Sequence, residues 1–122
     1  MRLGPKQRIF SWHGAGLIQY AYTLGFEIAI AYAYRPTGGH PDSNHKRKLA
    51  LDLDLFFNGR YQTTTAAHTP LGLFWEGKSG WYIPGQVHAV DKRRQSAEYL
   101  EFAWGGRFGD GNHYSIRHNG IR

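Results

Sequence analysis

The segment 49–57 constrains the fold of this chain more than any other part, because leucine recurs there at every second position. The four leucines are Leu49, Leu51, Leu53 and Leu55. Successive side chains of a β-strand point to opposite faces, so this spacing predicts a strand that buries its leucines in a core. Asp52 and Asp54 then project from the opposite face. The Asn58-Gly59 pair that follows is typical of a tight turn.

The flanking segments predict further helices and strands. Residues 13–24 carry apolar side chains at helical spacing and precede Gly25, which favours a helix with a glycine at its C-terminal end. Residues 26–34 alternate large and small side chains, which predicts a strand ending at Arg35-Pro36. Weaker signals indicate a loop over 36–44, a short helix starting within 70–75, a helix or a hairpin within 90–102, and a strand at 114–116. We therefore expect one α+β domain spanning residues 1–122, with a central antiparallel sheet and helices packed on one side.

Length and composition limit the class of protein. The 122 residues suit a single domain with one core. The chain has no cysteine, so any metal ion must be held by histidine and carboxylate. A net charge of +6 favours an anionic partner. Because the basic residues are scattered and match no nucleic-acid-binding motif, we expect no nucleic acid partner, and a polyanionic cell wall fits the charge equally well.

Two histidines and an aspartate form a candidate metal site. His45 lies in the loop before the leucine strand, Asp52 lies within that strand, and His113 precedes the last predicted strand. Two imidazoles and one carboxylate are a ligand set for zinc that leaves a fourth position for water, as hydrolases require. Asp110 is near enough in sequence to His113 to act as a general base. Spacing alone is a weak signal, since Asp54 rivals Asp52 as a ligand and Asp110 is also a typical turn residue.

The residues around these positions resemble the signature of a known family. The segment Ser43-Asn-His45-Lys-Arg-Lys-Leu-Ala50-Leu-Asp52 matches the pattern S-x-H-x-x-G-x-A-x-D at four of its five fixed positions, and Lys48 replaces the glycine. The block Trp104-Gly-Gly-Arg-Phe-Gly-Asp110-Gly-Asn-His113 is similar to the second block of the same family. This family comprises zinc D,D-carboxypeptidases and L-alanyl-D-glutamate endopeptidases, among them vancomycin-resistance carboxypeptidases and phage endolysins. The loop 35–43 is shorter than in the family, and residues 77–100 look like an insertion that forms a lid or a specificity wall.

The resemblance implies a fold, an activity and residue roles. The implied fold is of the hedgehog and D-Ala-D-Ala-peptidase type, with Zn²⁺ on the open face of the sheet, bound by His45, Asp52 and His113. Asp110 is then the catalytic base, and Arg35 holds a substrate carboxylate or stabilises the oxyanion. The implied activity is that of a metallopeptidase cleaving peptidoglycan stem peptides, most simply an L-alanyl-D-glutamate endopeptidase of phage or prophage origin. The alternatives are a D-Ala-D-Ala carboxypeptidase and a zinc-stabilised cell-wall-binding module without turnover.

The remaining expectations concern localisation and the other histidines and tryptophans. Residues 1–10 lack an apolar core of signal-peptide length, and no run approaches about 20 apolar residues. We expect a monomer without stable membrane insertion, made in the host cytoplasm and acting on the cell wall after release or as part of a virion. The histidines outside the candidate site are expected to face solvent, with His40 as a possible substrate contact; they are His13, His40, His68, His88 and His118. Three tryptophans either pack in the core or line the cleft, namely Trp75, Trp81 and Trp104.

Overall fold

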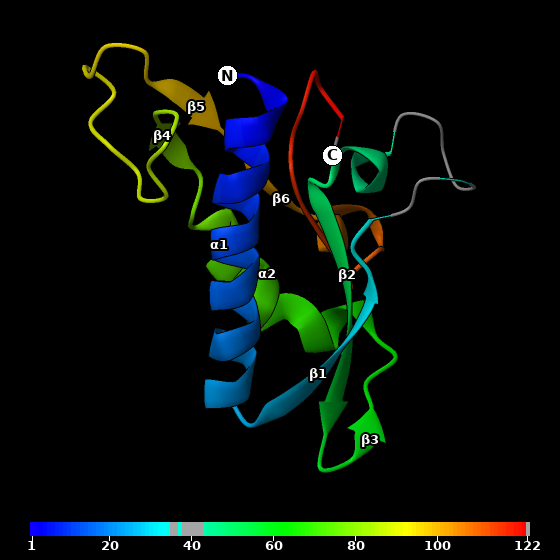
Figure 1. Cartoon of the computed structure of the whole chain (residues 1–122). Helices are drawn as coiled ribbons and strands as arrows, with labels where there is room; N and C mark the ends of the chain where they lie inside the picture. The colour runs from blue at the N-terminus through cyan, green and yellow to red at the C-terminus, as the bar shows by residue number, and fades with distance from the viewer. Residues whose placement is uncertain (35–36, 38–42, 122) are drawn as a thin grey trace.

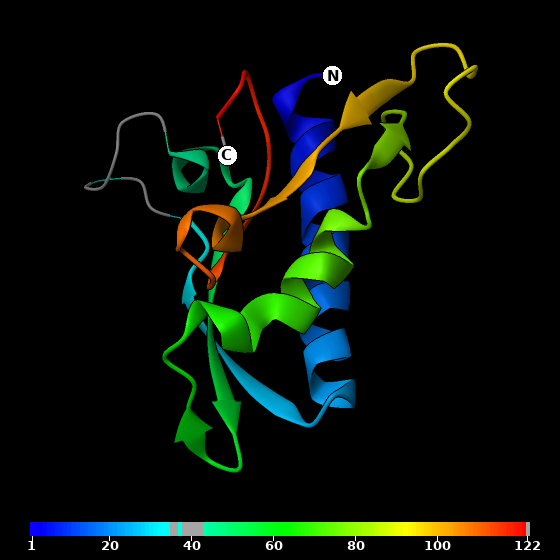
Figure 2. The same cartoon turned by 180° about the vertical axis from the view of Figure 1, so that it is seen from behind.

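A long helix, α1 (Leu3–Thr23), packs against one side of an antiparallel sheet in this computed structural model, as Figure 1 shows. The structure describes residues 1–34, 37 and 43–121. The principal sheet has the order β1 (Phe26–Tyr32), β2 (Ala50–Phe57), β7 (His113–Ile116) and β6 (Phe102–Trp104), and β3 (Arg60–Tyr61) pairs with β2. The second helix, α2 (Thr69–Glu76), lies on the same side of the sheet as α1 in the reverse view of Figure 2. The predicted α+β domain with an antiparallel sheet is therefore confirmed.

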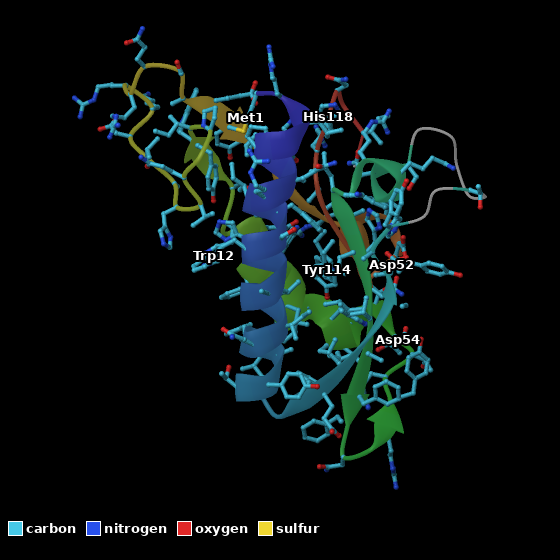
Figure 3. All side chains as sticks on the ribbon, in the orientation of Figure 1. Met1, Trp12, Asp52, Asp54, Tyr114 and His118 are labelled. Carbon is cyan, nitrogen blue, oxygen red and sulfur yellow. The ribbon has the colours of Figure 1, made fainter. Side chains whose placement is uncertain are left out.

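Strand β2 has the two faces that its sequence predicts. The four leucines of segment 49–55 are at most 6 % exposed, whereas Asp52 and Asp54 are half-buried on the other face. Figure 3 shows both aspartates on the side of β2 that faces away from α1. Asn58 and Gly59 both have positive φ, as the tight turn of a two-residue hairpin requires. The leucine face of β2 packs in the core, and the opposite face carries the two half-buried aspartates.

Helix α1 begins ten residues earlier than predicted, at Leu3 instead of residue 13. Its buried face already includes Ile9 and Phe10 and continues through His13 and Leu17 at helical spacing. Pro5 is tolerated because the first N–H groups of a helix have no partner within the helix. The Gly-Pro pair at positions 4 and 5 therefore marks the first turn of the helix, not a segment that precedes it.

Residues 77–100 form a second, two-stranded sheet. Strand β4 (Gly80–Tyr82) pairs with β5 (Glu98–Leu100), so segment 90–102 contains strands and no helix. The connecting loop packs on α1, where His13 Nε2 lies 2.6 Å from the Val87 carbonyl oxygen. In Figure 3 this loop and Asp52 lie on opposite sides of α1. The interpretation of this segment as a lid or wall of the candidate site is therefore wrong for this conformation.

The contact between α2 and β6 depends on a glycine. A Cβ atom at Gly72 would overlap the indole ring of Trp104, which is buried between the helix and the sheet. We expect Gly72→Ala to lower the free energy of unfolding by about 1–3 kcal/mol through overpacking. Gly16→Ala is the matched control, because a Cβ there meets nothing within 4 Å, and it should stabilise α1 by about 0.5–1 kcal/mol. Urea denaturation of the two variants measures both effects, and equal stabilities would contradict the close contact.

Candidate metal centre

Three side chains from separate elements meet on the open face of the sheet. His45 belongs to a 3₁₀ turn (Asn44–Arg47), Asp52 to β2, and His113 is the first residue of β7. Asp52 Oδ1 lies 3.2 Å from His45 Nε2 and 3.1 Å from His113 Nδ1. One potential ligand atom from each residue lies within 4.8 Å of the other two. These three residues can therefore hold a metal ion together. They are the residues that the sequence analysis names as candidate ligands, although 7 and 61 positions separate them along the chain.

The backbone explains why the three side chains converge. Asp52 and His113 are direct cross-strand partners in β2 and β7, so their side chains share one face. His45 is held in its turn by the Ser43 hydroxyl, which accepts a hydrogen bond of 3.2 Å from the His45 N–H. Lys48 ends this turn in the left-handed conformation, with φ of 57°. Glycine adopts that conformation most easily, and here a lysine occupies it.

A second contact orients the His45 ring. His45 Nδ1 lies 3.2 Å from the carbonyl oxygen of Ala33, which can only accept a hydrogen bond. A proton on Nδ1 donates to this carbonyl, which leaves Nε2, the nitrogen that faces Asp52, to carry a second proton or to bind a metal ion. A backbone carbonyl behind a histidine is a common support for metal-binding imidazoles. The ring is thus oriented for metal binding.

The carboxylate of Asp52 is ionised over a wide pH range. Burial alone raises its pKa, but hydrogen bonds from His113 and His45, together with their positive charge when protonated, outweigh burial and bring the pKa to about 2. Protons on the two imidazoles thus occupy the place that a cation would take, since a metal and these protons compete for the same atoms. The cluster therefore presents one fixed negative charge to a bound cation.

The two distances from Asp52 Oδ1 are compatible with ligand atoms that share one ion and also with hydrogen bonds between the side chains. Ligand atoms bound to zinc at about 2.0–2.2 Å are separated from each other by about 3.3 Å in a tetrahedron. Both measured separations from Asp52 Oδ1, 3.1 and 3.2 Å, are close to that value. Asp54 does not belong to the cluster, and its Oδ1 instead accepts a hydrogen bond of 3.4 Å from the Tyr61 hydroxyl. The geometry therefore favours Asp52 over its rival.

Asp110 lies in the turn that leads into His113. Its backbone N–H donates to the Gly105 carbonyl at 2.9 Å, and its carbonyl accepts from the His113 N–H at 3.2 Å. A Cβ at Gly105 would overlap the Asp110 carbonyl, so the turn requires a glycine at this position. The turn fixes the backbone of Asp110 relative to a candidate ligand. Its role as the base stays a prediction, and Arg35 and His40 lie outside the described residues.

The other histidines and tryptophans are placed by packing. His13 and His68 are buried, at 8 % and 3 % exposure, so the prediction that they face solvent was wrong. His68 falls at helical spacing with Leu71 and Trp75, a periodicity that could have indicated its burial.

Among the tryptophans, Trp75 and Trp104 are in the core, and Trp81 is half-buried. His88 is exposed as expected, and His118 is half-buried with its Nδ1 3.0 Å from Lys6 Nζ.

Buried neutral histidines predict a pH effect on stability. Burial lowers the pKa of His68 and of His13 below 6.5. The stability that these neutral rings contribute is complete above pH 6.5 and is lost as the pH falls through their lowered pKa values, because the unfolded chain binds the protons first. We expect the free energy of unfolding of the metal-free protein to decrease from about pH 7 to pH 5, with a shallower slope in His68→Gln. Urea denaturation with a chelator present measures this, and identical slopes would contradict a neutral His68.

Comparisons with models of protein families, with curated proteins and with solved structures found no match for this chain. Within the described residues, no helix combines the length and the apolar character needed to cross a membrane. The function is therefore argued from the geometry of the site and from the sequence patterns around it.

Proposed function

We propose that this domain is a zinc-dependent peptidase that cleaves peptidoglycan stem peptides, as an L-alanyl-D-glutamate endopeptidase of phage or prophage origin. The observation that carries the proposal is the convergence of His45 Nε2, Asp52 Oδ1 and His113 Nδ1 from three elements. The segments that supply these atoms are the ones that resemble the zinc peptidase family. We further propose that the helices on one side of the sheet and the cluster on the other correspond to the hedgehog and D-Ala-D-Ala-peptidase type of fold.

The residues of the site would have different roles in the reaction. Zinc at this position would polarise a peptide carbonyl and lower the pKa of a water molecule. Two imidazoles and one carboxylate would leave a fourth coordination position of the ion for water. Asp110 takes a proton from the attacking water and passes it to the leaving amine. The net charge of +6 supports attraction to an anionic wall and makes that attraction sensitive to salt.

Two alternatives share the metal cluster. A D-Ala-D-Ala carboxypeptidase would use the same ligands and the same base on the C-terminal bond of the stem peptide. A zinc-stabilised cell-wall-binding module would keep the ligands and lack turnover. The presence of Asp110 in the turn before His113 favours an enzyme over the binding module.

Mass spectrometry of digested peptidoglycan tests the proposal. Purified sacculi are incubated with the zinc-loaded protein, with the protein plus a chelator, and with the chelated protein after zinc is restored. We expect fragments with a new L-alanine C-terminus in the first and third samples only. Loss of the terminal D-alanine alone would establish the carboxypeptidase instead, and intact stem peptides with retained binding to sacculi would establish the binding module.

A further inference from the structure

A polar pocket of about 220 Å³ lies beside the turn that carries Asp110. One wall is formed by residues 61–65 and His68, and the other by residues 109–112. Residue 112, which lines the pocket, is followed directly in the sequence by the candidate ligand His113. A space of this volume accommodates a substituent of one substrate residue and not a whole peptide. The pocket is therefore suited to select one group near the bond that is cleaved.

His68 brings a hydrogen-bond donor to this pocket. Its Nδ1 lies 2.7 Å from the hydroxyl of Tyr114, which is fully buried. A phenol carries its proton at neutral pH, and burial lowers the pKa of His68, so its imidazole is neutral. Within the described residues the Tyr114 hydroxyl has no other hydrogen-bond partner, and leaving its proton unpaired would be costly. The hydroxyl therefore donates to His68 Nδ1, and His68 Nε2 carries the ring proton.

The His68 Nε2–H has no acceptor among the residues that the structure describes. The side chain is 3 % exposed and lines the pocket, so an acceptor for this N–H has to come from what the pocket contains. In the described part of the chain, His68 Nε2 is not one of the fully buried side-chain atoms that lack a partner, so its N–H opens into the pocket, where a water molecule or a ligand can accept from it. His68 thus defines one recognition element, an acceptor oxygen of the bound group.

The charges around the pocket select an uncharged group. Its walls contain no lysine or arginine among the described residues, and they include Asp110. Asp54 also acts electrostatically on His68. A substrate carboxylate would therefore meet like charges and no cation. A primary carboxamide fits better, because its oxygen accepts from His68 and its NH₂ group donates to the hydroxyls of Thr63–Thr65 or to a carboxylate.

We propose that this pocket binds the carboxamide of an amidated stem peptide, so that the enzyme prefers D-isoglutamine to D-glutamate as the residue after L-alanine. This inference rests on the proposed endopeptidase activity, because that bond places the α-substituent of the second residue beside the reacting carbonyl. His68 is then a specificity residue that contacts the substrate and takes no part in the bond cleavage itself.

Two matched tripeptides test the preference. The substrates are L-alanyl-D-isoglutaminyl-L-lysine and L-alanyl-γ-D-glutamyl-L-lysine, which differ only in the α-carboxamide. For the zinc-loaded protein we expect a kcat/KM at least about tenfold higher for the amidated peptide. His68→Leu should reduce this ratio to about one while keeping one zinc per chain, and His68→Gln, which can replace both hydrogen bonds, should restore part of it. An equal rate on both peptides, or a preference for the carboxylate, overturns the proposal.

A binding measurement separates this proposal from the enzymatic one. The metal-free protein is titrated with each tripeptide, and backbone amide shifts are followed by NMR. We expect saturable shifts at Thr63, Thr65 and Gly111 with the amidated peptide. The Kd obtained from these shifts should be at least about tenfold higher for the peptide with the free carboxylate. Binding of the amidated peptide without cleavage would refute the endopeptidase and support the pocket. Cleavage of both peptides without discrimination would support the endopeptidase and refute the pocket.

Discussion

Asp52→Asn is expected to abolish stoichiometric zinc binding and peptidoglycan cleavage, whereas Asp54→Asn should preserve both. The two aspartates are two residues apart on the same face of β2, and both are half-buried. Only Asp52 Oδ1 lies within 3.2 Å of both histidines, and asparagine cannot supply the anionic oxygen that zinc would share with them. The pair of variants therefore applies the same chemical change at two positions that differ mainly in their contact with the cluster.

Thermal unfolding gives this comparison a second readout. An ion that binds the folded state stabilises it by about 4 kcal/mol when its free concentration is 1,000 times its Kd. We expect added zinc to raise the Tm of the wild type and of Asp54→Asn and to leave the Tm of Asp52→Asn unchanged. Metal analysis of the dialysed proteins should give one zinc per chain for the first two only. Zinc retained by Asp52→Asn, or lost by Asp54→Asn, would show that the ligand set is wrong.

The parts of the fold that the sequence predicts are those with a regular local pattern. The leucine spacing of β2 placed Asp52 on the open face, because a strand has only two faces and one of them must be buried. The turn at Asn58-Gly59 followed from residues that favour positive φ. Short sequence patterns pointed to the two histidines of the cluster, and the antiparallel register of β2 and β7 brings His113 opposite Asp52.

The parts that the sequence does not predict depend on contacts between distant segments. Helix α1 starts at Leu3, but a Gly-Pro pair obscures the start, and long-range contacts, such as packing of Ile9 and Phe10 on the core, stabilise the first turns. The spacing of His68 could have indicated its burial, but not its contact with the Tyr114 hydroxyl 46 residues away. The pairing of β4 with β5 likewise joins two short segments that lack a strong alternation of their own. The pocket beside Asp110 arises from such contacts, so no local pattern indicates it.

Asp110→Asn is expected to reduce kcat by about 10²–10⁴-fold and to leave zinc binding unchanged. Asparagine has nearly the same shape as aspartate, and the hydrogen bonds that hold the turn use the backbone groups of Asp110, which the substitution retains. What it loses is the ability to accept a proton. Steady-state cleavage of a soluble muropeptide measures kcat, and zinc content with the zinc-dependent rise in Tm reports on the metal site.

The matched control is Asp91→Asn, which removes the same charge from an exposed ion pair with Arg93 on the loop beyond α1. Because net charge changes equally in both variants, any general loss of attraction to the anionic wall should affect them alike. A loss of kcat confined to Asp110→Asn, at full zinc content, would identify the base. Full activity in Asp110→Asn would place the proton transfer elsewhere, and loss of zinc would mean that the turn positions His113 through the carboxylate and not through its backbone.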